Sequence, residues 1–370
     1  ITSGAVKATL DAITNVDAND IITFTTSDTT VDASDLVALK AKVDTFITGS
    51  VTKITEVAAS VASVEEALNI LGADTQTTAV EITGAISAAD LNTIANNTAG
   101  AVTATITAGT VAATLAAISH VDGTAGNDKI TYTTNQTTVD ASDLVDLNAK
   151  VDTFNIASVT TITEAYNTVD LTTEVLAAEA LKEGANVEIT GGAISAANLN
   201  TLASDTTIGN ITATATETAA ATLVGLTTTN TDMITVTMES ASTAAADLNT
   251  IDGKTGTAVN ATAITALTGA ASDVKTALAS TGITTVTGSL AVNVSGNTSV
   301  ADINTINADT ATGVVTATAS ETDATTLVTL TTTATDMITV DLSLDVNANA
   351  TDVATINSKT GGIVTVKEVD

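Results

Sequence analysis

Internal repetition constrains this chain more than any other feature of its sequence. The segment TTVDASDLVALKAKVDTF at 29–46 returns almost unchanged as TTVDASDLVDLNAKVDTF at 137–154. A second segment, ATATETAAATLVGLTTTNTDMITVTM at 213–238, returns 104 positions later as ATASETDATTLVTLTTTATDMITVDL. Self-similarity at a fixed period is typical of repeat proteins, in which each unit packs mainly against its neighbours. We therefore expect one continuous domain over 1–370, with long repeats at about 1–100, 101–209, 210–313 and a partial 314–370.

A shorter period lies within each long repeat. Runs that alternate apolar residues with Thr, such as VTATIT from Val102 and KITYTT from Lys129, recur with starts 22 to 31 residues apart. Helical patterns lie between them: Val111, Leu115 and Ile118 fall at i, i+4 and i+7, which is one face of a helix. Each unit, which we call a rung, is therefore predicted to contain a strand of about six residues, a turn and a helix of two or three turns.

Strand–helix–strand connections of this size give parallel strands with right-handed crossovers. The sequence thus predicts an α/β repeat fold, a right-handed βα solenoid with parallel strands and short helices. Its architecture would be leucine-rich-repeat-like, without that consensus. A closed α/β barrel is disfavoured because there are more than eight units and they are internally duplicated. A β-helix or a series of β-sandwich domains are further alternatives.

The charge balance narrows the function. The net charge is −31, from 42 acidic residues against 11 Lys and no Arg. Nucleic acids and anionic membrane surfaces need clustered cations, which this chain lacks. Membrane insertion is not expected either, because no apolar run approaches the roughly 18 residues needed to span a bilayer. The absence of Cys, together with the abundance of Thr and Asp, favours a secreted protein, extracellular or on the cell surface.

One local motif suggests metal binding. GTAGNDKIT at 123–131 resembles the calcium-binding nonapeptide of the RTX (repeats-in-toxin) family, with Thr124 in place of the second Gly. In that family, turns of a β-roll hold Ca²⁺ between carbonyls and Asp carboxylates of successive copies. The resemblance and the matching strand starts give six candidate Ca²⁺ ligands: Asp20, Gly126, Asn127, Asp128, Asp232 and Asp336. The alternative, which the sequence favours, is that each Asp bonds turn amides.

Two other patterns have both a structural and a functional interpretation. Thr alternates with apolar residues in several strands, and stacked strands would align these Thr in ranks that resemble ice-binding surfaces: Thr103, Thr105, Thr212, Thr214, Thr235, Thr237, Thr316 and Thr318. The simpler explanation is that Thr is a good strand former. Asn recurs in the helical motif Leu-Asn-Thr at Asn92, Asn200 and Asn249, and again after Ile303 as Asn304. These Asn residues could form a ladder that caps turns, or they could occupy exposed helix positions.

Catalysis has little support in the sequence. His120 is the single His, there is no Cys, and the expected position of His120 is a loop. Paired carboxylates could hydrolyse glycosides, but two Tyr and three Phe cannot line a sugar-binding cleft. We expect no enzyme activity.

The two termini fall inside the repeat. Val6–Leu10 aligns with Val111–Leu115, so the strand expected before this helix is missing, and the chain finishes on the strand IVTVK at 363–367. Joining the tail to the head restores the strand–turn–helix order. We therefore expect either that copies stack head to tail into a homopolymer or that the sequence is a segment of a larger solenoid.

The phrases ADLNTIDGKTG at 246–256 and ITALTGAASDVKTALAS at 264–280 resemble repeats of large Thr/Ala/Asp-rich surface proteins of cyanobacteria and marine bacteria. The resemblance implies export and a structural role. We therefore expect a non-catalytic subunit of an extracellular filament, surface layer or sheath. The alternatives are an adhesin or ligand-binding stalk that binds cell-surface glycans, and an ice-binding solenoid.

Overall fold

The structure is a computed structural model of the 370-residue chain. It describes residues 4–16, 20–72, 77–122, 126–166, 171–205, 207–285, 289–310 and 312–367. The contacts group into two units, which are described separately: unit 1 comprises 1–164 and 173–185, and unit 2 comprises 165–172 and 186–370. The single continuous domain over 1–370 stays a prediction.

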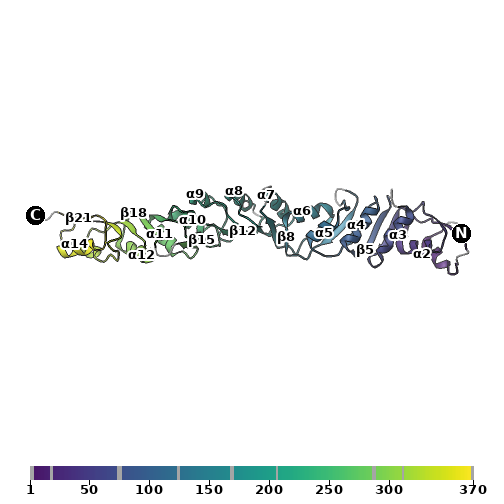
Figure 1. Cartoon of the computed structure of the whole chain (residues 1–370), viewed down its shortest axis with the longest axis horizontal. Helices are drawn as coiled ribbons and strands as arrows, with labels where there is room; N and C mark the ends of the chain where they lie inside the picture. Colours follow the sequence, from purple (N-terminus) through teal and green to yellow (C-terminus); the bar gives the residue numbers. More distant parts are fainter. Residues whose placement is uncertain are drawn as a thin grey trace. The chain divides into compact units, whose positions relative to one another are not determined.

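Unit 1 alternates short helices with one or two strand segments (Figure 1). Its helices are α1 Val6–Ala12, α2 Ala33–Lys40, α3 Ala62–Leu71, α4 Ala88–Asn97, α5 Val111–Ala117, α6 Ala141–Lys150 and α7 Leu171–Glu179, with a 3₁₀ turn at Ala58–Ser60. Its strands are β1 Thr23–Thr25, β2 Thr30–Asp32, β3 Thr45–Ile47, β4 Lys53–Val57, β5 Ala79–Ile86, β6 Val102–Ile106, β7 Lys129–Thr133, β8 Thr138–Asp140, β9 Thr153–Asn155 and β10 Thr161–Ala165.

Unit 2 has the same alternation. Its helices are α8 Ala196–Ala203, α9 Ala220–Leu223, α10 Ala245–Asp252, α11 Ala271–Ala279, α12 Val300–Thr310, α13 Ala324–Leu327 and α14 Ala350–Asn357. Its strands are β11 Asn186–Thr190, β12 Ile211–Thr214, β13 Met233–Thr235, β14 Ser242–Ala244, β15 Val259–Ala261, β16 Ala266–Ala270, β17 Ile283–Thr285, β18 Ala291–Thr298, β19 Val315–Ala319, β20 Met337–Leu342 and β21 Val364–Val366.

The strands pair in parallel within each unit. In unit 1 the largest sheet has the order β2-β4-β5-β6-β7-β9, and in unit 2 it has the order β14-β16-β18-β19-β20-β21. Paired residues lie 20 to 26 positions apart in the chain, for example Thr30 with Lys53 and Thr316 with Met337. The α/β class with parallel sheets and short helices is thereby confirmed. A sheet built in such steps places each rung beside the rung that follows it in sequence.

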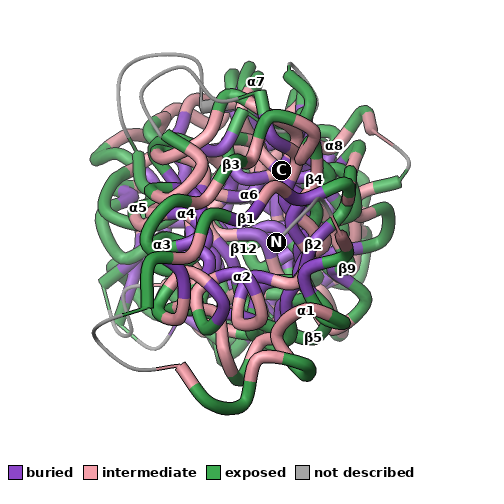
Figure 2. Tube along the Cα trace, turned by 90° about the vertical axis from the view of Figure 1, so that its right-hand side faces the viewer, coloured by how far each residue is buried: buried purple, intermediate pink, exposed green. Residues whose placement is uncertain are grey.

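The core of each unit is built from columns of apolar side chains. In unit 1, Val31 pairs with Ile54, Ile54 with Val80, and Val80 with Val102, and none of the four is more than 4% exposed. The helices contribute fully buried leucines to the same interior, such as Leu36, Leu68 and Leu91. Figure 2 shows the buried positions on the inner side of the chain's turns. Small and β-branched side chains suit this narrow core because closely spaced rungs leave little room for aromatic rings.

The few aromatic residues are concentrated in matching places. Phe24 pairs with Phe46 in register, with ring centroids 5.4 Å apart, and Tyr132 pairs with Phe154 at 5.5 Å. The Tyr132 hydroxyl donates a 2.6 Å hydrogen bond to the Gly109 carbonyl, so its polar end is satisfied although the residue is buried. These two pairs occupy equivalent rungs of the first two long repeats.

The structure corrects the expected rung in two respects. Several rungs contain two strand segments rather than one, because a turn interrupts the strand, as between β1 and β2 or between β3 and β4. The longest predicted spacing between strand starts, 31 residues, was measured from the first strand segment of one rung (β15) to the second segment of the next rung (β18). Helices α9 and α13 have one turn of four residues rather than two or three turns. Each is followed by a run of β-branched Thr, which disfavours helix continuation.

Two glycines allow the long strands to bend. Gly84 in β5 has φ +99° and Gly296 in β18 has φ +75°, a conformation that other residues rarely adopt. At both places the register with the following strand shifts, between Glu81 and Ala85 and between Asn293 and Asn297. The two strands therefore each contain a bulge at the same relative position.

Candidate functional site

The predicted calcium ligands lie in the turns before strands. Asp232 and Asp336 precede β13 and β20, and both are buried. Asp20 is exposed and precedes β1. Asp128 precedes β7 and is 8% exposed, whereas Gly126 and Asn127 are exposed. Gly123 and Thr124 of the RTX-like motif lie outside the described residues.

Asp232 and Asp336 bond backbone amides of two rungs. The Asp232 carboxylate accepts a 2.8 Å hydrogen bond from Ile211 N–H, at the start of the preceding strand, and its other oxygen accepts one from Thr229 N–H at 2.8 Å. Asp336 repeats this arrangement with Val315 N–H at 2.9 Å and Thr333 N–H at 2.8 Å. Each carboxylate therefore links its own turn to the preceding strand. This is the turn interpretation that the sequence favoured, extended to a neighbouring rung.

Asp128 forms a similar link in unit 1. It accepts hydrogen bonds from Val102 N–H at 2.8 Å and Asp122 N–H at 3.3 Å. Burial, and to a smaller extent the nearby Asp122 carboxylate, raise the pKa of Asp128 despite these two bonds. A Cβ at position 126 would lie 1.9 Å from the Asp122 carboxyl carbon, so a larger residue there would require the Asp122 side chain to move.

The described residues do not bring the six candidates together as a metal centre. No group of three or more His, Cys, Asp or Glu side chains that could hold a metal ion occurs in the part of the chain that the structure describes. Calcium binding by Asp20, Gly126, Asn127, Asp128, Asp232 and Asp336 stays a prediction.

A second set of links between rungs was missed in the sequence. The first N–H groups of a helix have no intrahelical acceptor. In several helices here, a side chain 21 to 25 residues further along the chain accepts a hydrogen bond from one of them. Glu321 accepts from Val300 N–H at 3.0 Å and Glu217 from Ala196 N–H at 2.7 Å. The other members are Asp28 with Val6, Glu56 with Ser34, Gln136 with Val111 and Asp345 with Ala324. The sequence did contain a signal, because an acidic residue or Gln follows the start of each of these six helices by 21 to 25 residues.

The recurrent Asn residues form a third link. Asn304 donates from Nδ2 to the Thr329 carbonyl at 3.0 Å and accepts from Thr331 N–H at 2.8 Å. Asn200 makes the same pair of bonds with Gly225 and Thr227. These residues are half-buried, so the two alternatives of a turn-capping ladder and a helix surface position both describe part of what is found.

The Thr ranks are exposed but mixed. Thr214 pairs with Thr235 and Thr318 with Thr339 on the outer face of their sheets. In the neighbouring rank, Thr212 lies between Glu188 and Met233, and Thr103 lies between Glu81 and Lys129. Charged and long side chains therefore interrupt the ranks that a flat ice-binding face would need.

The single His is exposed and lies next to a Ser. The Nδ1 atom of His120 is 3.1 Å from the Ser119 Oγ, and His120 N–H donates to the Asn92 Oδ1 at 2.7 Å. No carboxylate hydrogen-bonds the His120 ring within the described residues. The bond to Asn92 therefore links the His120 loop to the preceding rung. In the described ranges, no helix has both the length and the apolar character needed to cross a membrane.

Comparison with family models, with curated proteins and with solved structures finds no match to this chain.

Proposed function

We propose that the chain is a non-catalytic structural protein, a right-handed βα solenoid that forms a subunit of an extracellular filament, surface layer or sheath. One observation carries the proposal. The amides at the start of strands and helices are satisfied by side chains of the following rung, as in the bonds from Val315 N–H to Asp336 and from Val300 N–H to Glu321. A rung of this kind is complete only when another rung follows it.

Such a design supports a mechanical role because the links repeat along the chain. Each rung adds apolar burial and several hydrogen bonds to its neighbour, so stability is distributed over many equivalent interfaces. The acidic, Thr-rich exterior keeps the surface soluble, and a net charge of −31 opposes non-specific lateral association. End-to-end stacking of copies is the mode of assembly that this architecture favours. The resemblance to cyanobacterial and marine bacterial surface proteins supports export to the cell surface.

Negative-stain electron microscopy across a concentration series, with Ca²⁺ and then with a chelator, tests the proposal. We expect unbranched polymers that lengthen with protein concentration. A monodisperse monomer under all conditions would contradict the proposal that the chain assembles into filaments. Glycan binding without assembly would support the adhesin instead, and faceted ice crystals with thermal hysteresis would support ice binding.

A further inference from the structure

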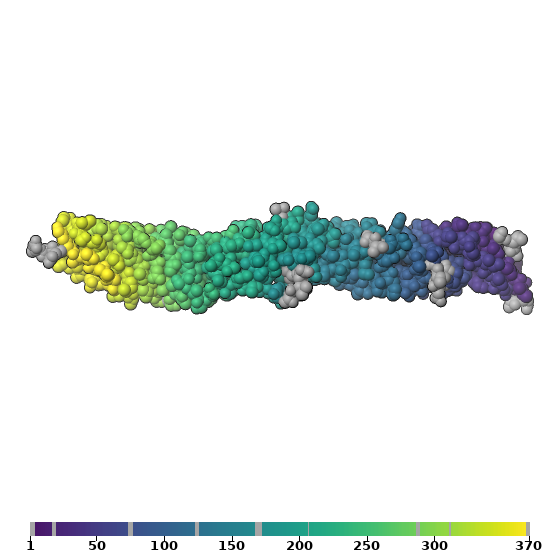
Figure 3. Space-filling model, turned by 90° about the horizontal axis from the view of Figure 1, so that it is seen from above, coloured from purple at the N-terminus to yellow at the C-terminus, as the bar shows by residue number. Residues whose placement is uncertain are grey.

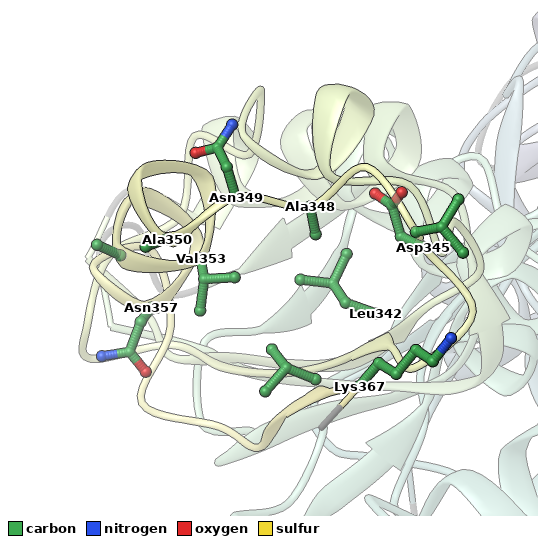
Figure 4. A pocket seen from close by; sticks show the side chains of 11 residues that line it. Leu342, Asp345, Ala348, Asn349, Ala350, Val353, Asn357 and Lys367 are labelled. Carbon is green, nitrogen blue, oxygen red and sulfur yellow. The ribbon is translucent and has the colours of Figure 1, made fainter. Parts of the chain in front are cut away.

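An apolar hollow of about 740 Å³ lies beside α14 and β21 (Figure 4). Leu342, Val353 and Val366 line it, together with the loop that contains Val346. Val346 is 77% exposed and Val366 is 47% exposed. The segment is coloured yellow in Figure 3 and lies at the surface. We call the surface of α14, β21 and the hollow the acceptor face.

The same sequence pattern occurs inside unit 1, where it is covered. AADLNTIANNTAGAVTA at 88–104 and ATDVATINSKTGGIVTV at 350–366 are identical at eight of 17 positions, without gaps. This alignment matches Leu91 with Val353, Val102 with Val364 and Ala104 with Val366. Leu91 and Val102 are 0% exposed and Ala104 is 4% exposed, whereas Val353 and Val364 are only half-buried.

The cover of the internal copy is the next rung. Helix α5 packs beside α4, and β7 pairs with β6 through Thr103 with Lys129 and Ala104 with Ile130. A cover of the same design for the acceptor face would place a helix beside α14 and a parallel strand beside β21.

The chain contains a second version of that cover. VKATLDAI at 6–13 matches VAATLAAI at 111–118 at six of eight positions, and IITFT at 21–25 matches KITYT at 129–133. We call the surface formed by residues 6–16 and 20–25 the donor face. Thr114, Ile118 and Ile130 are at most 4% exposed inside unit 1. Their counterparts Thr9, Ile13 and Ile22 are half-buried, and Ile21 is 90% exposed.

We infer that the acceptor face of one copy binds the donor face of a second copy, in the geometry of the internal contact between α4–β6 and α5–β7. The inference rests on the proposed function and specifies its interface. Helix α1 of the second copy then packs beside α14, and β1 extends the sheet beyond β21. The internal register predicts that Thr365 faces Ile21 and that Val366 faces Ile22 across the junction.

Two single substitutions test the junction in the full chain. Val366→Asp places a charge on the acceptor face and Ile21→Asp places one on the donor face, and both sites are exposed enough to leave folding intact. Each variant keeps one functional face, so each alone should remain monomeric, with an association constant at least about tenfold weaker than wild type. Their equimolar mixture should give heterodimers and no longer species in sedimentation velocity. Val57→Asp is the matched control because Val57 is 50% exposed and lies on neither face, and this variant should polymerise like wild type.

A second measurement checks the register. Because the chain has no Cys, the double variant Ile21→Cys, Thr365→Cys can form disulfides only through the introduced pair, and oxidation should give a ladder of covalent oligomers. If wild type and Val366→Asp form polymers of the same length, the inferred interface is wrong but the proposal of a filament still holds. A wild-type chain that stays monomeric would overturn both.

Discussion

Asp336 accepts a 2.9 Å hydrogen bond from the backbone N–H of Val315, at the start of the strand one rung earlier. Asp232 and Ile211 have the same relationship at 2.8 Å, 104 residues earlier in the chain. In the rungs that follow Asp232 and Asp336, Thr255 and Thr360 take this role, accepting from Ile234 N–H at 2.9 Å and from Ile338 N–H at 2.7 Å. A short polar side chain before a strand thus repeatedly bonds the first amide of the preceding strand, and we call this bond the strand-start link.

The strand-start link of Asp336 should contribute measurably to the free energy of unfolding. Asp336→Ala leaves the buried Val315 N–H without its acceptor and should lower the free energy of unfolding by about 1–3 kcal/mol in urea titrations. Asp336→Asn retains an oxygen acceptor and should lower the free energy of unfolding by a smaller amount. Asp309 is exposed on α12, and Asp309→Ala should stay within about 0.5 kcal/mol of wild type. Equal effects of Asp336→Ala and Asp309→Ala would contradict a stabilising role for the strand-start link.

The helix links should behave as caps provided by another rung. Glu321→Ala removes the acceptor of Val300 N–H and should destabilise the chain by about 0.5–2 kcal/mol, as loss of an N-cap does. Hydrogen exchange should accelerate in the first turn of α12, although that turn is unchanged in sequence. Glu321→Gln keeps the acceptor and serves as the conservative variant, and Glu239→Ala is the exposed control. Faster exchange confined to the turn around residue 321 would refute a cap on α12.

Asp128 gives the stability a specific pH dependence. Burial raises the pKa of this carboxyl above its ordinary 3.8, so the folded state binds the proton more readily than the unfolded chain. As the pH falls through the folded pKa towards 3.8, this residue's contribution to folding free energy should become more favourable. Wild type should therefore gain stability relative to Asp128→Asn over that interval. Unfolding curves measured at several pH values test the sign, and a constant difference between the two proteins would contradict it.

Calcium distinguishes the two interpretations of the RTX-like motif. Both Asp128 oxygens already accept backbone hydrogen bonds, which predicts that Ca²⁺ acts only by screening the negative charge. Ca²⁺ should then raise the melting temperature of wild type and Asp128→Asn by similar amounts. A calcium effect that disappears in Asp128→Asn would establish the predicted ligand role of this residue instead.

Much of the fold could be predicted because the repeats expose its period. The alternation of Thr with Val or Ile located strands such as β6 and β7, and the i, i+4, i+7 pattern located α5. The short strands β2 and β3 were missed because three-residue segments carry no visible alternation. The lengths of the one-turn helices α9 and α13 were overestimated because two or three turns were expected for the helix of every rung. The Thr runs that follow these two helices favour extended backbone.

The links between rungs were harder to predict. Asp232 and Asp336 were identified as turn residues or calcium ligands, but their partners lie 21 residues away, and local sequence does not show which amide faces them. Glu217 and Glu321 belong to turns without any motif, so only their shared spacing of 21 residues from a helix start could reveal them. Asn304 was correctly singled out, and its partners Thr329 and Thr331 became clear only from the register of neighbouring rungs.

Electron cryomicroscopy of the assembled chain tests the central claim most directly. We expect filaments in which parallel strands repeat about every 4.8 Å along the axis and continue without interruption from β21 of one copy to β1 of the next. A map with separate globular particles, or with gaps in the sheet at each subunit boundary, would contradict it.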